Sequence, residues 1–141
     1  MKKLIYFFSI AFLLFQSCSS SDNSQNSTLD TSLLFKKWYI VSQTYNGVKS
    51  NGYVCSNGNR DYLEFKEPNI LNYYHIIGSS NCNYTSDGPY NWIKKGNIIS
   101  VYFNEKLVST LTINELTITT FSFITTYAGN GQSALHVYSS Y

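Results

Sequence analysis

In the stretch Tyr62-Leu63-Glu64-Phe65-Lys66, two apolar side chains alternate with three that carry a polar group. Because successive side chains of a β-strand point to opposite faces, the alternation predicts a strand with Leu63 and Phe65 on its buried face. The strand ends at Glu67-Pro68-Asn69, a turn sequence in which proline fixes the backbone. The stretch therefore predicts one strand of a sheet that buries a single face.

Similar strand signals recur on both sides of this stretch. Toward the N-terminus, a run from Trp38 to Tyr45 ends at the turn dipeptide Asn46-Gly47. Toward the C-terminus, Gly78 to Gly88 is expected to be a loop, and Lys95-Gly96-Asn97 a hairpin turn. The remaining strands are expected at Ile70 to Ile77, Tyr90 to Lys94, Ile98 to Phe103, Leu107 to Ile113, Leu116 to Thr125 and Ala134 to Tyr141.

Eight strands joined mostly by short turns predict an all-β fold, an eight-stranded antiparallel up-and-down barrel. Closure removes the exposed edges that an open sheet would leave. Before the first strand, Asp30 is positioned to cap one or two helical turns. Near the C-terminus, strict alternation would put Leu116 and Ile118 on one face of the strand and Phe121 and Phe123 on the other. A bulge near Thr119-Thr120 would return them to a common inward face and is therefore predicted.

The N-terminus carries an export signal. Lys2 and Lys3 precede an apolar run from Leu4 to Phe15, which is too short to span a bilayer, since a spanning helix needs about 20 residues. The following Phe15-Gln16-Ser17-Cys18 resembles the lipobox of bacterial lipoproteins, which implies that Cys18 is lipidated after residues 1–17 are removed. We expect an anchor at the outer membrane, on its periplasmic face or at the cell surface.

Residues 18–28 consist almost wholly of Ser, Asn, Gln and Asp, a composition typical of a disordered tether. Residues 29–141 then have a length that suits one domain. The chain has 13 Tyr, 9 Phe and 2 Trp but only 2 Pro, which favours strands in that domain.

Export places the cysteines in an oxidising compartment, where thiols tend to form disulfides. With Cys18 assigned to the lipid, Cys55 and Cys82 remain as one candidate pair. Their bond would stabilise the fold by about 3 to 4 kcal/mol in the chain-entropy model. Two unpaired thiols are the alternative. A metal site is disfavoured, because the cysteines together with His75 and His136 match no compact ligand spacing.

The charge of the chain argues against nucleic-acid binding. Ten Lys and Arg residues face eight Asp and Glu residues, and two of the basic ones, Lys2 and Lys3, lie in the export signal. A nucleic-acid surface needs a basic stripe on one face, which this near-balance does not supply.

The sequence carries no local signature of an enzyme or of a cofactor site. His75 and His136 are the only side chains that titrate near neutral pH, and neither adjoins a nucleophile or phosphate-loop motif. Asp61, Glu64 and Glu67 form the only acidic cluster, which strand alternation divides between two faces and which we expect to be solvated surface. We expect no catalysis, no cofactor and no metal.

Several short motifs resemble, in their order, the lipocalin-like domain of small lipoproteins from Bacteroidetes-type bacteria. The resemblance covers residues 29–141 and implies a small barrel with an apolar pocket. Lys36 stands two places before Trp38, where true lipocalins have Gly, so the ligands of that family are not implied. The motifs are Trp38, Cys55 before Leu63-Glu64-Phe65, Cys82 before Gly88-Pro89-Tyr90-Asn91-Trp92, Gly96-Asn97-Ile98-Ile99 and Leu116-Thr117-Ile118.

Aromatic residues on the predicted strands are the candidates for a ligand-binding interior. Rings provide apolar area, and Tyr or Trp adds a polar group that orients a ligand. The same rings can instead fill the interior, because an eight-stranded barrel is wide enough only for side chains or one small ligand. The candidates are Trp38, Phe65, Tyr73, Trp92 and Phe103.

We therefore expect a lipid-anchored envelope protein that binds a small apolar ligand inside a barrel. The alternative is an interaction module, an inhibitor or assembly accessory with a filled core, whose partner is an envelope protein or a glycan. Tyrosines expected on outward faces would form its contact surface. They are Tyr39, Tyr45, Tyr62 and Tyr74.

Overall fold

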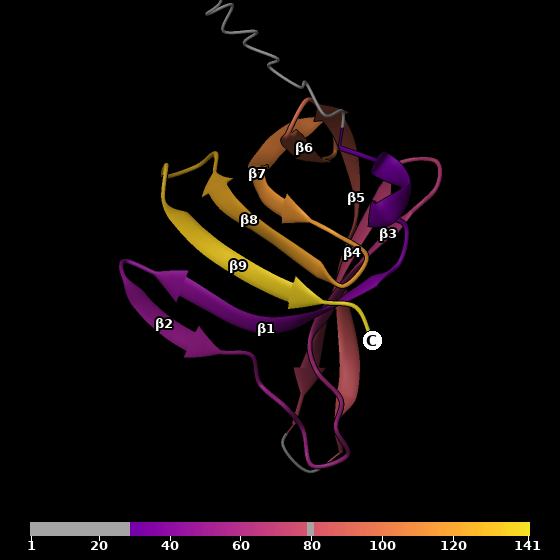
Figure 1. Cartoon of the computed structure of the whole chain (residues 1–141), viewed down its shortest axis with the longest axis vertical. Helices are drawn as coiled ribbons and strands as arrows, with labels where there is room; N and C mark the ends of the chain where they lie inside the picture. The colour runs from indigo at the N-terminus through magenta and orange to yellow at the C-terminus, as the bar shows by residue number, and fades with distance from the viewer. Residues whose placement is uncertain (1–28, 79–80) are drawn as a thin grey trace, which may run out of the picture.

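The structure is a computed structural model, which describes residues 29–78 and 81–141. The signal predicted for residues 1–17, the tether predicted for 18–28 and the candidate lipidation site Cys18 lie outside the described residues. In the described part, no helix has the length and apolar character needed to cross a membrane. Its elements are η2 (Thr31–Leu34), β1 (Lys37–Tyr45), β2 (Val48–Asn51), β3 (Tyr62–Lys66), β4 (Ile70–Ile77), β5 (Asn83–Lys95), β6 (Ile98–Phe103), β7 (Lys106–Leu116), β8 (Thr120–Tyr127) and β9 (Ser133–Ser139) (Figure 1).

Strand β1 closes the sheet into a barrel because both of its edges are paired. Its first residues, Lys37 to Tyr39, pair with β3 along one edge. Its other edge pairs with β9, from Tyr39↔Ser139 to Tyr45↔Ala134. The remaining neighbours follow chain order, so β1 and β3 to β9 form an eight-stranded antiparallel barrel. The predicted all-β up-and-down barrel is confirmed.

The strands depart from the sequence-based prediction in three places. The strand predicted from Leu116 to Thr125 is observed as β8 (Thr120–Tyr127), and Leu116 instead ends β7. Strand β2 was not predicted, because all four of its residues are exposed and no alternation marks it. It pairs with the second half of β1 across the predicted Asn46-Gly47 turn and projects from the barrel as a hairpin (Figure 1). Strand β5 begins at Asn83 rather than Tyr90, so most of the predicted Gly78 to Gly88 loop is strand paired with β4.

The bulge predicted near Thr119-Thr120 is wrong in position. The register of β7 against β8 shifts earlier, between Ile113 and Glu115. This shift brings Leu116 to the same buried face as Ile113. The parity change at Thr119 reflects a turn between two strands, held by the Thr117 hydroxyl oxygen, which accepts a hydrogen bond from the Thr120 N–H at 2.9 Å.

Large apolar side chains occupy the end of the barrel nearest η2, which we call the filled half. Phe121 is fully buried, and its ring centroid lies 5.4 Å from that of Trp38 and 5.9 Å from that of Phe65. Leu34 of η2 is also fully buried, and its carbonyl accepts a hydrogen bond from Trp38 Nε1 at 3.2 Å. The helical turn predicted after Asp30 is confirmed, since Asp30 caps η2 by accepting from the Ser32 N–H at 2.9 Å.

The predicted disulfide between Cys55 and Cys82 is confirmed. It joins the loop between β2 and β3 to the residue that precedes β5, with the two Cα atoms 5.9 Å apart. The loop beside it turns tightly, because the Cys55 N–H donates to the Asn59 carbonyl at 2.8 Å. The disulfide thus fixes a long connection to the projecting end of the β4–β5 hairpin.

Replacing both cysteines, Cys55→Ala with Cys82→Ala, should lower the free energy of unfolding by about 2 to 4 kcal/mol, because the unfolded chain gains the freedom of an open loop. Urea unfolding followed by tryptophan fluorescence measures the difference. A reductant should lower the stability of the natural protein to that of the double variant and leave the double variant unchanged. Equal stability of the two proteins under oxidising conditions would contradict a structural role for the bond.

Candidate functional site

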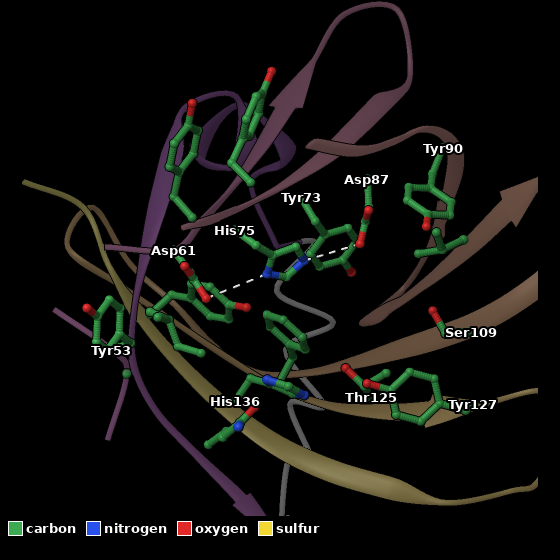
Figure 2. A pocket seen from close by; sticks show the side chains of 18 of the residues that line it. Tyr53, Asp61, Tyr73, His75, Asp87, Tyr90, Ser109, Thr125, Tyr127 and His136 are labelled. Atoms are coloured by element: carbon green, nitrogen blue, oxygen red, sulfur yellow. Dashed lines mark ion pairs between the residues drawn. The ribbon is translucent and has the colours of Figure 1, made fainter. Parts of the chain in front are cut away.

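A cavity of about 840 Å³ occupies the half of the barrel away from η2, which we call the hollow half (Figure 2). Individual strands run from the filled half into it. On β4, Leu71 is fully buried in the core, whereas Tyr73 and His75 line the cavity. On β5, Trp92 lies in the core, whereas Tyr90 lines the cavity. The cavity is thus continuous with the core and shares its walls.

Small side chains at inward positions explain why this half is hollow. On β7, the buried inward positions are Ser109, Leu111 and Ile113, and Ser109 lines the cavity. On β8, Phe121 and Phe123 are followed by buried Thr125, which also lines the cavity. On these two strands, the inward positions that are aromatic or aliphatic in the filled half are replaced in the hollow half by the smaller Ser109 and Thr125. The strands therefore enclose space that their own side chains do not fill.

Tyrosines supply much of the wall of the cavity. Tyr73 and Tyr90 meet edge to face with ring centroids 5.8 Å apart, and Tyr127 of β8 lies across the cavity from them (Figure 2). Tyr138 of β9 also lines the cavity. Burial raises the pKa of Tyr73 and that of Tyr138, so both hydroxyls are protonated at neutral pH. The wall thus presents aromatic faces together with neutral hydroxyl groups.

His136 lies on the wall formed by β9, in a cluster with the rings of Phe123 and Tyr138, whose own centroids are 5.5 Å apart. Its ring centroid is 5.3 Å from that of Phe123 and 6.2 Å from that of Tyr138. Both ring nitrogens are buried and have no hydrogen-bond partner among the described residues. Burial lowers the pKa of His136, so the imidazole is neutral at pH 7.

A histidine between two carboxylates lines another part of the cavity. His75 Nδ1 lies 3.5 Å from Asp61 Oδ2, and His75 Nε2 lies 3.3 Å from Asp87 Oδ2 (Figure 2). Asp61 is held in place because its Oδ1 accepts a hydrogen bond from the Ile76 N–H at 2.8 Å. In the part of the chain that the structure describes, no group of three or more His, Cys, Asp or Glu residues is arranged to hold a metal ion.

Sequence reasoning missed this arrangement. Asp61 was expected on a solvated surface, yet it lines the cavity. Pairing of Tyr62 with Tyr74 places Asp61 level with His75, and pairing of Tyr73 with Asp87 brings the second carboxylate alongside. One signal could have revealed the position of Asp61. Asp61 lies two residues before Leu63, so strand alternation assigns both side chains to the inward face.

The structure separates the five candidate ligand-binding residues into two groups. Tyr73 and Phe103 line the cavity, as predicted for a ligand-binding interior. Trp38, Phe65 and Trp92 are at most 3% exposed, belong to the filled half and do not line this cavity. The reason is their distance along the strands: each lies on the part of its strand that packs toward η2.

An outer tyrosine cluster lies on the opposite face of the β3–β4 wall. Tyr62 stacks on Tyr74 with ring centroids 4.4 Å apart, and Tyr39 and Tyr84 lie 5.5 and 5.2 Å from Tyr62. Burial, with Tyr74 and Glu64 nearby, raises the pKa of Tyr62 to about 12. Tyr45, which was also predicted to face outward, is exposed on the β1–β2 hairpin.

Comparison with known proteins agrees with this architecture. Residues 34–123, more than half of the chain, match the family model described as a lipocalin-like domain. A search among curated proteins found no match. The matched region begins in η2 and reaches Phe123, so it includes the closing strand β1, the disulfide and the Asp61–His75–Asp87 group. The chain therefore belongs to the lipocalin-like domain family.

Proposed function

We propose that the protein binds a small, largely apolar molecule in the hollow half of its barrel. The single observation that supports this proposal is the cavity of about 840 Å³, which falls within the range of about 300 to 1,000 Å³ typical of ligand pockets. Aromatic rings such as Tyr73, Phe103 and Phe123 would contact the body of the ligand. The hydroxyl groups of Ser109 and Thr125 would contact its polar atoms.

We propose binding without catalysis. His75 contacts two carboxylates, and among the described residues no serine, threonine or cysteine donates a hydrogen bond to it. Nucleophilic catalysis requires a base within hydrogen-bond reach of a hydroxyl or thiol, an arrangement that His75 lacks here. His136 packs against the rings of Phe123 and Tyr138, and its ring nitrogens have no hydrogen-bond partner among the described residues.

We further propose that the barrel is held at the outer membrane by lipid on Cys18, on the periplasmic face or at the cell surface. The support is the sequence Phe15-Gln16-Ser17-Cys18 after an apolar run, together with the Cys55–Cys82 disulfide, which fits an oxidising compartment. The ligand would then be captured or stored outside the cytoplasm.

A second candidate function uses the outer tyrosine cluster as a surface for a protein or glycan partner. Tyr84 and Tyr141 of this region are exposed, and they border a shallow groove that Asn57 and Asn59 also line. Tyrosine and asparagine are common in binding surfaces, since one offers flat area and the other adaptable hydrogen bonds. This function would leave the cavity unused.

Filling the cavity should abolish ligand binding. Ser109→Phe places a ring inside the hollow half and should weaken binding of the neutral dye Nile red at least about tenfold, or about 1.4 kcal/mol. Thr110→Phe is the matched control, because it adds the same ring to the next residue of β7, on the opposite face. Dye fluorescence measures both, and equal affinity in the two variants would contradict the cavity as the binding site.

Lipidation has its own test. Cys18→Ala should abolish incorporation of a labelled fatty acid into the protein and release it from the membrane fraction of its host. Cys55→Ala with Cys82→Ala is the control and should retain the label, because those thiols are joined in the fold. Labelling that survives in the Cys18→Ala protein would refute the anchor.

A further inference from the structure

The charges that line the cavity sum to a negative value, because His75 can balance at most one of the two carboxylates there. Asp61 and Asp87 contribute two carboxylates, and among the described lining residues there is no lysine or arginine. His136 does not offset this charge, because burial lowers its pKa and keeps it neutral. An anionic ligand would enter this site against the negative charge of its carboxylates, which is unfavourable.

The bonding capacity of His75 leaves part of this negative charge unpaired. One imidazole carries at most one positive charge, so His75 can balance the charge of Asp61 or of Asp87 but not of both. Asp61 also accepts from the Ile76 N–H, whereas no further hydrogen-bond donor to Asp87 is present among the described residues. Asp87 is therefore the carboxylate best able to accept from a ligand, and its side chain is 61% exposed and accessible.

Aromatic rings surround the space next to Asp87. Tyr73 lies directly opposite Asp87 in the pairing of β4 with β5, so their side chains stand side by side on the inward face. Tyr90 follows three residues later, and the pKa of its hydroxyl is raised by burial and then by the charge of Asp87. Ring faces attract cations when they lie within about 6 Å. A cation near Asp87 would meet both a carboxylate and aromatic faces.

Resting on the proposed ligand-binding function, we propose that the cavity selects small amphipathic cations, with an ammonium group at Asp87 and Asp61 and an apolar or aromatic body in the hollow half. The carboxylates give the site its preference for charge, and the tyrosines and Phe123 accept the body. The same lining disfavours the carboxylate of a fatty acid. Because both aspartates are partly exposed, the attraction should weaken as salt is raised.

Three probes that share one ring and one linker test this proposal by calorimetry on the purified protein: tryptamine, a cation; tryptophol, its neutral alcohol; and indole-3-propionate, an anion. We expect tryptamine to bind at least about tenfold more tightly than tryptophol, and the anion to bind most weakly. Asp87→Asn should bring the affinity for tryptamine to within about threefold of that for tryptophol. Glu67→Gln, at an exposed carboxylate outside the cavity lining, is the control and should change nothing.

Asp87→Lys provides a second, independent readout and should reverse the order, so that the anion binds more tightly than the amine. Equal affinities for the three probes, or tightest binding of the anion to the natural protein, would overturn the charge preference. The proposed function would still stand in that case if the natural protein binds Nile red and Ser109→Phe abolishes that binding. If neither Nile red nor any indole probe binds, the proposed function and this inference both fall. Asp61→Asn serves as a further variant if the Asp87 proteins do not fold.

Discussion

The antiparallel pairing of β1 with β9 is the constraint on which the rest of the structure depends. It joins the first barrel strand to the last and leaves one enclosed interior for side chains from eight strands. An eight-stranded barrel has room for its own side chains or for one small ligand. This chain divides that room along the barrel axis, with rings such as Trp38 and Phe121 in one half and with Ser109 and Thr125 in the other. The position of the cavity follows from the small inward residues on β7 and β8.

The sequence allowed the fold to be predicted because the barrel is built from local signals. Alternation in Tyr62 to Lys66 and the Asn46-Gly47 turn each identify a local element, and short connections make chain neighbours spatial neighbours. The limits of strands were harder to predict where burial is low. Strand β2 and the first part of β5 are exposed on both faces, so their composition resembles that of loops.

The site was predicted less completely because it depends on register and depth, which residue type does not encode. Trp38 and Tyr73 are both inward aromatic residues, yet one lies in the core and the other lines the cavity. The Asp61–His75–Asp87 group forms only when β3, β4 and β5 pair in one register, since its members come from three segments. The disulfide was easier to predict, because assigning Cys18 to the predicted lipid anchor leaves two cysteines for one bond.

The most direct test of the central claim is a crystal structure of the protein grown with 5-bromoindole, a small neutral ring whose bromine can be located by anomalous scattering. The account predicts a bromine peak inside the hollow half, among Tyr73, Tyr127 and Phe123. It also predicts that Trp38 and Phe121 keep their packing in the filled half. A hollow half closed by its own side chains, or bromine only on the outer surface, would contradict the account.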